Sequence, residues 1–211
     1  MSRIPPLPAD TPQHQSRWRR FLGLAGMTVL GWRVTGTLPN TQKCILAIAP
    51  HTSNWDFIVG IFAYFAMQIR ASWLVKHTAL KGPWGPLGRY LGGIGIDRGR
   101  AGDVAAQLAK EFSRREQLVL AITPEGTRKR VFDWKRGFHN IALAAGVPIV
   151  PVAIDYSTKT IQFFDAFMPQ PDFAADLVKL QSHFSASMAY HPNQYADGRG
   201  TRSDDERPNL G

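Results

Sequence analysis

The stretch "KCILAIAPHTSNWD", residues 43–56, decides the fold, because it joins an apolar run directly to residues that start a helix. Residues 44–49 are all apolar, as expected of a strand that is covered on both faces of a sheet. Thr52, Ser53 and Asn54 are good N-cap residues, and the mostly apolar residues after them suit a helix. The stretch therefore predicts a buried strand that ends at a polar turn and continues as a helix.

The same alternation of strand and helix continues along the chain. Five nearly continuous apolar runs are predicted strands, at residues 43–50, 71–76, 92–97, 117–123 and 147–156. Four stretches are predicted helices, at residues 54–69, 101–115, 137–146 and 171–187. This order predicts an α/β fold with a largely parallel central sheet flanked by helices. Ligands of such sheets bind beyond the carboxyl ends of the strands, so a site is expected in the loops that follow them.

The last of these strands contains two prolines, Pro148 and Pro151. Proline has no backbone N–H to donate to a neighbouring strand. We therefore expect this strand to lie at an edge of the sheet or to bend sharply.

Composition limits the class of protein. The 211 residues suit one globular domain, and the formal net charge of +9 with a pI near 10.1 indicates an anionic partner. Nucleic acid, anionic lipid and a phosphorylated substrate all remain open on charge alone. The single cysteine, Cys44, excludes an intrachain disulfide and favours a reducing compartment.

The two ends of the chain differ from its centre. Residues 1–14 are rich in proline and are predicted to be a flexible lead-in, and residues 191–211 lack an apolar run and are predicted to be a loose tail. Between them we expect an N-terminal helix at residues 15–32 and the main domain at residues 33–190.

The predicted N-terminal helix has basic residues followed by an apolar stretch. Arg17, Arg19 and Arg20 precede the 12 residues from Phe21 to Trp32, which are too few for the roughly 20 residues that a membrane-spanning helix needs. Basic flanks and tryptophans at both ends suit a helix that lies in a membrane interface. The alternative is a first core helix, and the sequence leaves both open.

His51 and Asp56 stand at the polar turn after the first predicted strand. On one continuous helix, residues five apart are rotated by about 140° from each other, so the two side chains can meet only if the helix begins between them. The carboxylate would then fix the tautomer of the imidazole and leave its other nitrogen as a general base for a hydroxyl. The alternative is a capping role for each residue at a solvated turn.

Two further strand ends carry polar residues that could bind an anion. The strand at 117–123 leads to Glu125, Gly126 and Arg128, where glycine permits close approach of a ligand and arginine can grip a phosphate. Five of the nine residues at 128–136 are basic, although ordinary surface charge is the alternative. Arg98 follows the glycine-rich strand at 92–97, as an anion contact or as an exposed turn residue.

Four blocks of the sequence, in this order, resemble the glycerolipid acyltransferase family, which includes the 1-acylglycerol-3-phosphate acyltransferases. The family's blocks are N-H-x-x-x-x-D, G-x-x-x-I-D-R, F-P-E-G-T-R and V-P-I-V-P-V. In this chain they are PHTSNWD, GGIGIDR, TPEGTR and VPIVPV, and the resemblance spans about residues 32–160. Pro50 replaces the family's asparagine and Thr123 its phenylalanine, so the local support of the site is expected to differ.

The resemblance implies roles for particular residues. His51 is the general base and Asp56 its orienting partner. The phosphate of the acceptor is bound by Arg98, Glu125, Gly126, Thr127 and Arg128. Residues 33–190 are then an acyltransferase domain that needs no metal or other cofactor.

The resemblance also implies a reaction and a place in the cell. The family moves an acyl chain from an acyl-coenzyme A or acyl-carrier-protein thioester to a lysolipid hydroxyl, here most simply 1-acylglycerol-3-phosphate or a related lysophospholipid in phospholipid biosynthesis. A lyso-ornithine-type aminolipid is the alternative acceptor, in which case Arg128 binds a carboxylate or serves the donor. The expected location is peripheral or monotopic on the cytoplasmic face of the membrane, with an anionic membrane surface as partner.

Three other classes of protein are less well supported by the residues. A nucleic-acid-binding module should carry a recognised motif and aromatic residues through its basic patch, but residues 128–136 contain only Phe132 and Trp134, so we expect no nucleic acid partner. A metal-dependent hydrolase would need histidines at ligand spacing, which the sequence lacks. Cys44 as an acyl-enzyme nucleophile is the third, but a cysteine in an apolar strand is usually an inert core residue.

Overall fold

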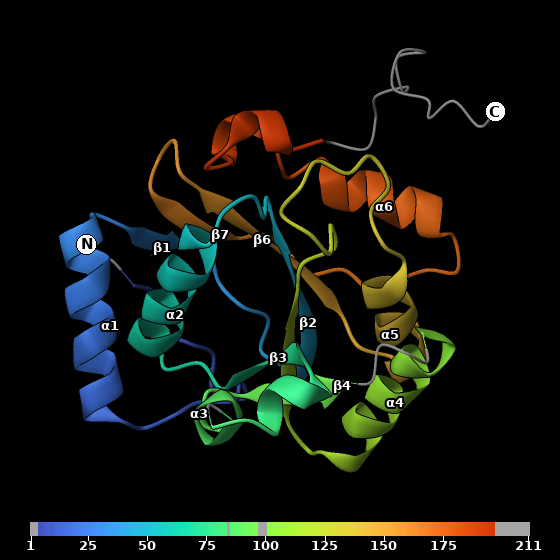
Figure 1. Ribbon diagram of the computed structural model, residues 1–211, viewed down its shortest axis with the longest axis horizontal. Helices are drawn as coiled ribbons and strands as arrows, with labels where there is room; N and C mark the ends of the chain where they lie inside the picture. The colour runs from blue at the N-terminus through green and yellow to red at the C-terminus, as the bar shows by residue number, and fades with distance from the viewer. Residues whose placement is uncertain (1–3, 84, 97–100, 197–211) are drawn as a thin grey trace.

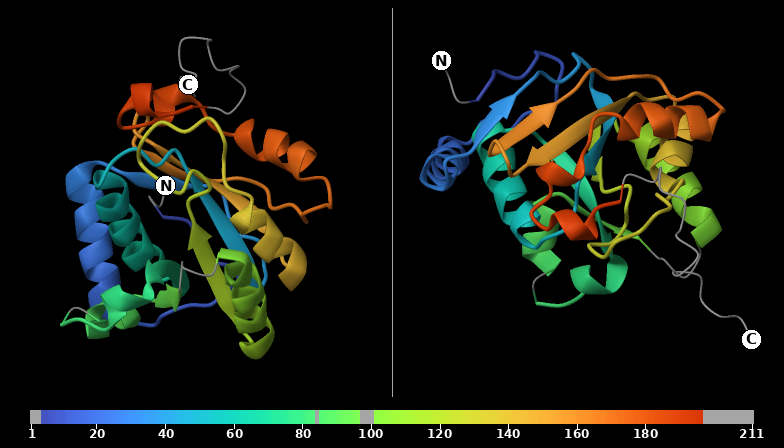
Figure 2. Two further views of the ribbon diagram at one scale, coloured as in Figure 1. Left: turned by 45° about the vertical axis from the view of Figure 1, so that its right-hand side comes forward. Right: turned by 90° about the horizontal axis from the view of Figure 1, so that it is seen from above.

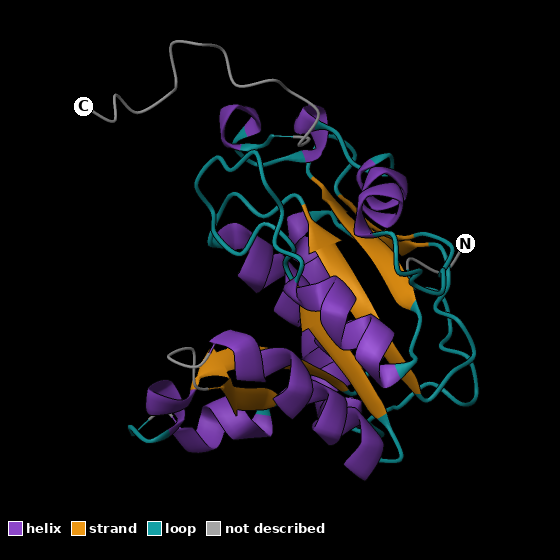
Figure 3. Ribbon diagram, turned by 90° about the vertical axis from the view of Figure 1, so that its right-hand side faces the viewer, coloured by secondary structure: helices purple, strands orange, loops and turns teal. Residues whose placement is uncertain are grey.

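A computed structural model describes residues 4–83, 85–96 and 101–196 of the chain. Its described part has a seven-stranded sheet between two layers of helices (Figures 1 and 3). In the order of the sheet, the strands are β1 (Arg33–Thr35), β7 (Thr160–Phe163), β6 (Ile149–Asp155), β2 (Lys43–Ala49), β5 (Leu118–Ile122), β3 (Ala71–Lys76) and β4 (Gly93–Ile96). Strands β2 to β6 are parallel, whereas β7 is antiparallel to β6 and carries β1 beside it. The predicted α/β fold with a largely parallel sheet is confirmed.

The helices cover both faces of this sheet (Figure 2). They are α1 (Arg17–Leu30), α2 (Trp55–Met67), α3 (Gly85–Tyr90), α4 (Ala101–Arg114), α5 (Gly137–Ala145) and α6 (Phe173–Gln181), with 3-10 turns η1 (His77–Leu80), η2 (Ala186–Met188) and η3 (Pro192–Gln194). Helices α1 and α2 pack on one face, and α4, α5 and α6 pack on the other. Successive side chains of a strand point to opposite faces, so Leu46 of β2 joins the first core and Ile45 the second.

Helix α1 packs its small residues directly on α2. A side chain at Gly23 would collide with the backbone of Ala66, so glycine is what allows the two helices to approach this closely. Met27 and Trp32 are buried in the core beneath. The prediction of a first core helix therefore holds for this face of α1.

The opposite side of α1 is apolar and exposed. Trp18, Phe21 and Val29 all have more than half of their surface accessible, and Trp18 stacks on Phe21. No helix among the described residues is long and apolar enough to cross a membrane. The membrane-interface role of α1 thus stays a prediction.

The described ends of the chain differ from the predicted flexible lead-in and loose tail. Thr11 and Pro12 are buried, and the backbone of residues 12–14 pairs with that of residues 68–70. At the other end, Tyr195 is buried and Trp134 Nε1 donates to the Ala196 carbonyl at 3.4 Å. Buried side chains and paired backbone hold both segments on the domain.

Strand β6 also differs from the prediction, because it lies inside the sheet between β7 and β2. Its Pro151 accepts a hydrogen bond from Phe164 N, one residue beyond the end of β7. Since the N–H and C=O of one strand residue point to the same side, the missing donor faces Phe164, one residue beyond the end of β7. An interior strand can therefore contain this proline at the cost of one bond at the end of its pairing with β7.

Candidate active site at the end of β2

Helix α2 begins between His51 and Asp56, as the sequence analysis required. Its first residue is Trp55, whose backbone N–H donates to Ser53 Oγ at 3.1 Å. Asn54 occupies the N-cap position without a capping bond from its side chain. Instead, Asp56 in the first turn accepts from the backbone N–H groups of Thr52 and Ser53, both at 2.9 Å.

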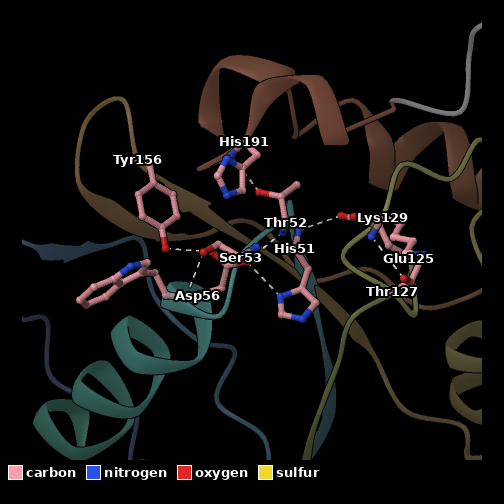
Figure 4. A network of polar contacts seen from close by, with 10 residues as sticks. His51, Thr52, Ser53, Asp56, Glu125, Thr127, Lys129, Tyr156 and His191 are labelled. Atoms are coloured by element: carbon pink, nitrogen blue, oxygen red, sulfur yellow. Dashed lines mark hydrogen bonds and ion pairs between the residues drawn. The ribbon is translucent and has the colours of Figure 1, made fainter.

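His51 and Asp56 form a close pair at this turn (Figure 4). The distance from His51 Nδ1 to Asp56 Oδ2 is 3.0 Å, and the Asp56 side chain is only 2% exposed. The His51 side chain is 22% exposed and lines the large pocket described below. Because Nδ1 faces the carboxylate, Nε2 is the nitrogen left for a substrate.

Glu125 supports the loop that carries His51. Its Oε1 accepts a hydrogen bond from the His51 backbone N–H at 2.9 Å, and the residue is buried. Burial raises the pKa of Glu125 to about 7, and the nearby Asp56 charge adds to this, while the bond from His51 N acts in the opposite direction. The described contacts thus tie Glu125 to the histidine loop. Its predicted role in binding the acceptor's phosphate stays a prediction.

The loop after Glu125 brings one basic side chain, that of Lys135, to the pocket. Gly126 has a φ of +67°, and a Cβ there would stand 2.8 Å from Cδ of Lys135, so a larger residue would displace that lysine. Lys135 lines the same pocket as His51, whereas Arg128 is exposed on the same loop and is not part of the lining. Thr127 Oγ1 accepts from Lys129 N within this loop. Lys135 was not singled out in the sequence, where it was only one of five basic residues in the run 128–136.

The pocket beside His51 has a volume of about 510 Å³ and is mainly apolar. It extends from the polar mouth into the space between α2 and the sheet. Strands β2, β6 and β7 line it with Leu46, Ile48, Val152, Ile154, Ile161 and Phe163. On the α2 side, Gly60 faces the pocket, and a Cβ placed there would meet nothing within 4 Å.

Tyr156 completes the surroundings of Asp56. This tyrosine directly follows β6, and its hydroxyl donates to Asp56 Oδ1 at 2.8 Å. Figure 4 shows it approaching the carboxylate from the side opposite Glu125. The sequence analysis missed Tyr156, because the two residues are 100 positions apart and no local pattern connects them.

The first residues of the predicted tail also reach the site. His191 N donates to Thr52 Oγ1 at 3.1 Å. With its side-chain amide oriented to donate, Gln194 Nε2 reaches the carbonyl oxygens of Arg128 and Thr52 at 2.9 and 3.0 Å. The C-terminal segment therefore joins the His51 loop to the Arg128 loop.

Three more residues singled out in the sequence are Arg98, Cys44 and Pro50. Arg98 lies outside the described residues. Cys44 is buried in β2, and burial raises the pKa of its thiol to about 12, which fits an inert core residue. Across the described chain, no three His, Cys, Asp or Glu residues are grouped so as to hold a metal ion. Pro50 follows Ala49 through a cis peptide bond, and nothing in the structure explains why it replaces the family's asparagine.

Comparison with known proteins identifies the family. A family model described as "Acyltransferase" matches residues 31–155, which is more than half of the chain. The chain belongs to the acyltransferase family. The matched region contains β2, the His51 loop, α2 and the Glu125 loop, and it ends at the last residue of β6.

Individual relatives and a solved structure agree with this family. The 1-acyl-sn-glycerol-3-phosphate acyltransferase of Haemophilus influenzae is 31% identical over 134 residues, covering 59% of this chain and 54% of the relative. The protein of the same name from Escherichia coli is 31% identical over 121 residues, covering 54% and 48%. The chain thus matches about half the length of these relatives.

A crystal structure shows the same fold. The 1-acyl-sn-glycerophosphate (LPA) acyltransferase PlsC of Thermotoga maritima superposes with a TM-score of 0.56 at 20% identity, covering 76% of this chain and 71% of that one. At this identity the likeness supports the α/β architecture of this acyltransferase-family chain and nothing finer.

Proposed function

We propose that this protein transfers a fatty acyl chain from a thioester to the hydroxyl of a lysolipid, with His51 as general base. The single observation that carries the proposal is the placement of the His51–Asp56 pair at the mouth of an apolar pocket. Its membership of the acyltransferase family and the names of its relatives support the same reaction class.

The reaction needs little from the protein beyond the pair. Asp56 keeps the proton on His51 Nδ1, so Nε2 takes the proton of the acceptor hydroxyl as its oxygen attacks the thioester carbonyl. When the tetrahedral intermediate collapses, the carbon–sulfur bond breaks, the new ester forms, and Nε2 returns the proton to the leaving thiolate. The thioester is already activated, so this base and the correct placement of both substrates supply most of what is required.

The pocket suits the chain of an acyl substrate. Its apolar lining would hold a hydrocarbon, and its mouth at His51 would hold the thioester carbonyl. Gly60 leaves open space beside the pocket. It does so although glycine inside a helix costs up to about 1 kcal/mol of stability relative to alanine.

A substitution at Gly60 tests this use of the pocket. Gly60→Leu should lower turnover with long-chain donors at least tenfold relative to short-chain donors, because the leucine would occupy the pocket. Gly82→Leu is the matched control, since a Cβ at Gly82 also meets nothing within 4 Å and Gly82 does not line the pocket. Equal losses for all chain lengths in Gly60→Leu would contradict an acyl chain in this space.

The basic residues at the mouth support a phosphorylated acceptor. Lys135 lines the pocket, and exposed Arg128 and Lys129 stand on the same loop. We infer 1-acylglycerol-3-phosphate or a related lysophospholipid as acceptor, in line with the names of the relatives. The donor is an acyl-coenzyme A or an acyl-carrier protein, and no metal or other cofactor takes part in the proposed steps.

The decisive experiment is an acyl-transfer assay with the purified full chain. A panel of lysolipids, including lysophosphatidate, its dephosphorylated monoacylglycerol and a lyso-ornithine lipid, is offered with both types of donor, and products are identified by mass spectrometry. Transfer to lysophosphatidate well above transfer to monoacylglycerol is expected. Preference for the aminolipid would replace the proposed acceptor, and hydrolysis of the thioester without transfer would contradict the function.

We further propose that the exposed face of α1 binds the cytoplasmic surface of an anionic membrane. Trp18, Phe21 and Val29 would enter the interface beside exposed Arg17 and Arg20. Deleting residues 1–32 would also remove buried Met27 and Trp32, so a surface substitution is the cleaner test. Val29→Ser should reduce sedimentation with phosphatidylglycerol vesicles severalfold, whereas Val178→Ser on α6, also an exposed valine, should not. Equal binding by both variants would contradict this surface.

A further inference from the structure

The carboxylate of Asp56 is held on both of its oxygens. Its Oδ2 receives three contacts, from His51 Nδ1 at 3.0 Å and from the backbone N–H groups of Thr52 and Ser53 at 2.9 Å. Its Oδ1 receives the hydroxyl of Tyr156 at 2.8 Å (Figure 4). The Oδ1 bond is the one that fixes the rotation of the carboxylate plane, because the other three contacts converge on a single atom.

Tyr156 is itself fixed by elements from both ends of the chain. Trp32, two residues after the end of α1, packs edge-on against its ring with the ring centroids 4.9 Å apart. Tyr190 packs against the ring in the same way at 5.0 Å, and Tyr156 N donates to the Met188 carbonyl at 2.9 Å. The hydroxyl therefore has little freedom to leave the carboxylate.

The chemistry of the phenol suits a permanent donor. Burial raises the pKa of Tyr156, and the hydrogen bond to Asp56 and the charge of that carboxylate raise it further. Near neutral pH the hydroxyl therefore keeps its proton and donates it to Asp56. A donor on Oδ1 also withdraws negative charge from Oδ2, which faces His51.

We propose that Tyr156 is a positioning residue for acyl transfer, which orients Asp56 through Oδ1 and thereby sets the direction and basicity of His51. This inference rests on the proposed function of His51 as the general base. Tyr156 touches neither reacting atom in this scheme, so removal of its hydroxyl should alter the rate constant of the chemical step rather than substrate binding.

The first test is Tyr156→Phe, which removes one oxygen and keeps the ring between Trp32 and Tyr190. We expect kcat to fall about tenfold, the KM for each substrate to stay within about twofold, and the acid limb of the kcat/KM profile to move to higher pH. The limb moves because Oδ1 has lost its donor, so Asp56 holds a protonated imidazole more strongly. Glu125, which accepts from His51 N and interacts with the Asp56 charge, and Tyr190, which packs on the Tyr156 ring, are present in both proteins.

Tyr190→Phe is the matched control, because it removes the hydroxyl of the neighbouring tyrosine. It should leave both kcat and the acid limb unchanged. An unchanged kcat and limb in Tyr156→Phe, or equal changes in the two variants, would overturn the proposal in favour of simple ring packing.

A second measurement does not depend on turnover. In protein labelled with ¹⁵N-histidine, the Nδ1 proton of His51 reports its hydrogen bond to Asp56, and it should move downfield in Tyr156→Phe. Fluorinated tyrosine at position 156 is a stronger donor and should move it upfield, while leaving the packing intact. Shifts in these directions without activity on any lysolipid would refute the proposed function alone, and no shift in either protein would refute the role of Tyr156.

Discussion

Among the residues that the structure describes, two histidine–aspartate pairs have nearly equal length but differ in what surrounds them. The pair of His51 and Asp56 lies at the end of β2, with the atoms 3.0 Å apart. The pair of His139 Nε2 and Asp176 Oδ2 joins α5 to α6 at 2.9 Å, where Asp176 also accepts from Gln170 N. Distance alone would rate the second pair as the better candidate.

Access to the imidazole separates the two pairs. The His51 side chain is 22% exposed and lines a pocket, whereas the His139 side chain is 2% exposed and packs against the ring of Phe173. A base must reach the proton that it removes, and His139 cannot meet a substrate. The accessible pair of His51 and Asp56, called the open pair below, is placed for chemistry. The buried pair of His139 and Asp176, called the closed pair, holds α5 and α6 together.

The largest expected effect is on turnover at the open pair. His51→Ala and Asp56→Ala should each lower kcat for acyl transfer by about 10²–10⁴-fold, because each removes the oriented general base. Circular dichroism and thermal melting should show a folded protein in both cases. Turnover near that of the natural protein in either variant would break the assignment of this pair to catalysis.

The closed pair should respond in the opposite way. His139→Ala leaves the buried Asp176 without its partner and opens a cavity, so it should lower the free energy of unfolding by about 3–5 kcal/mol, measured by urea denaturation. The kcat per folded molecule should stay within about twofold of the natural value. A selective loss of kcat with unchanged stability would mean that the two pairs had been assigned the wrong way round.

The smallest expected effect depends on pH and concerns Glu125, the buried carboxyl beside the open pair. The pKa of Glu125 is raised to about 7, so the unfolded chain loses this proton first and stability falls as pH rises from about 4.5 to about 7. Glu125→Gln should therefore gain about 1–3 kcal/mol relative to the natural protein between pH 4 and pH 8. Its amide oxygen can still accept from His51 N, so activity should largely survive. Parallel pH curves for the two proteins would contradict the raised pKa.

The parallel part of the fold was predictable because its signals are local. Strands β2 to β6 are apolar runs, and α2, α4 and α5 have a helical pattern, so each was found within a few residues. Helix α6 was found too, but it ends at Gln181, six residues before the predicted end. The N-cap residues Thr52, Ser53 and Asn54 indicated where α2 starts. Strands β1 and β7 were missed, because three or four residues are too short to show a period and their partners decide their conformation.

The site was predictable only where its residues sit at strand ends close to recognisable blocks. His51, Asp56 and Glu125 met that condition, and the structure brings all three together. Tyr156 and Lys135 did not stand out, since a tyrosine at a strand end and a lysine in a basic run look ordinary. Contacts between residues far apart in the chain give them their importance, and local patterns carry no information about such contacts.

The contact at Gly23 has a mechanical consequence. Because the backbones of α1 and α2 are in close contact there, we expect the two helices to move together. The first turn of α2 carries Asp56, and Trp32, which follows α1, packs on the ring of Tyr156. A displacement of the outer face of α1 should therefore reach both supports of the same carboxylate, the first turn of α2 and the ring of Tyr156.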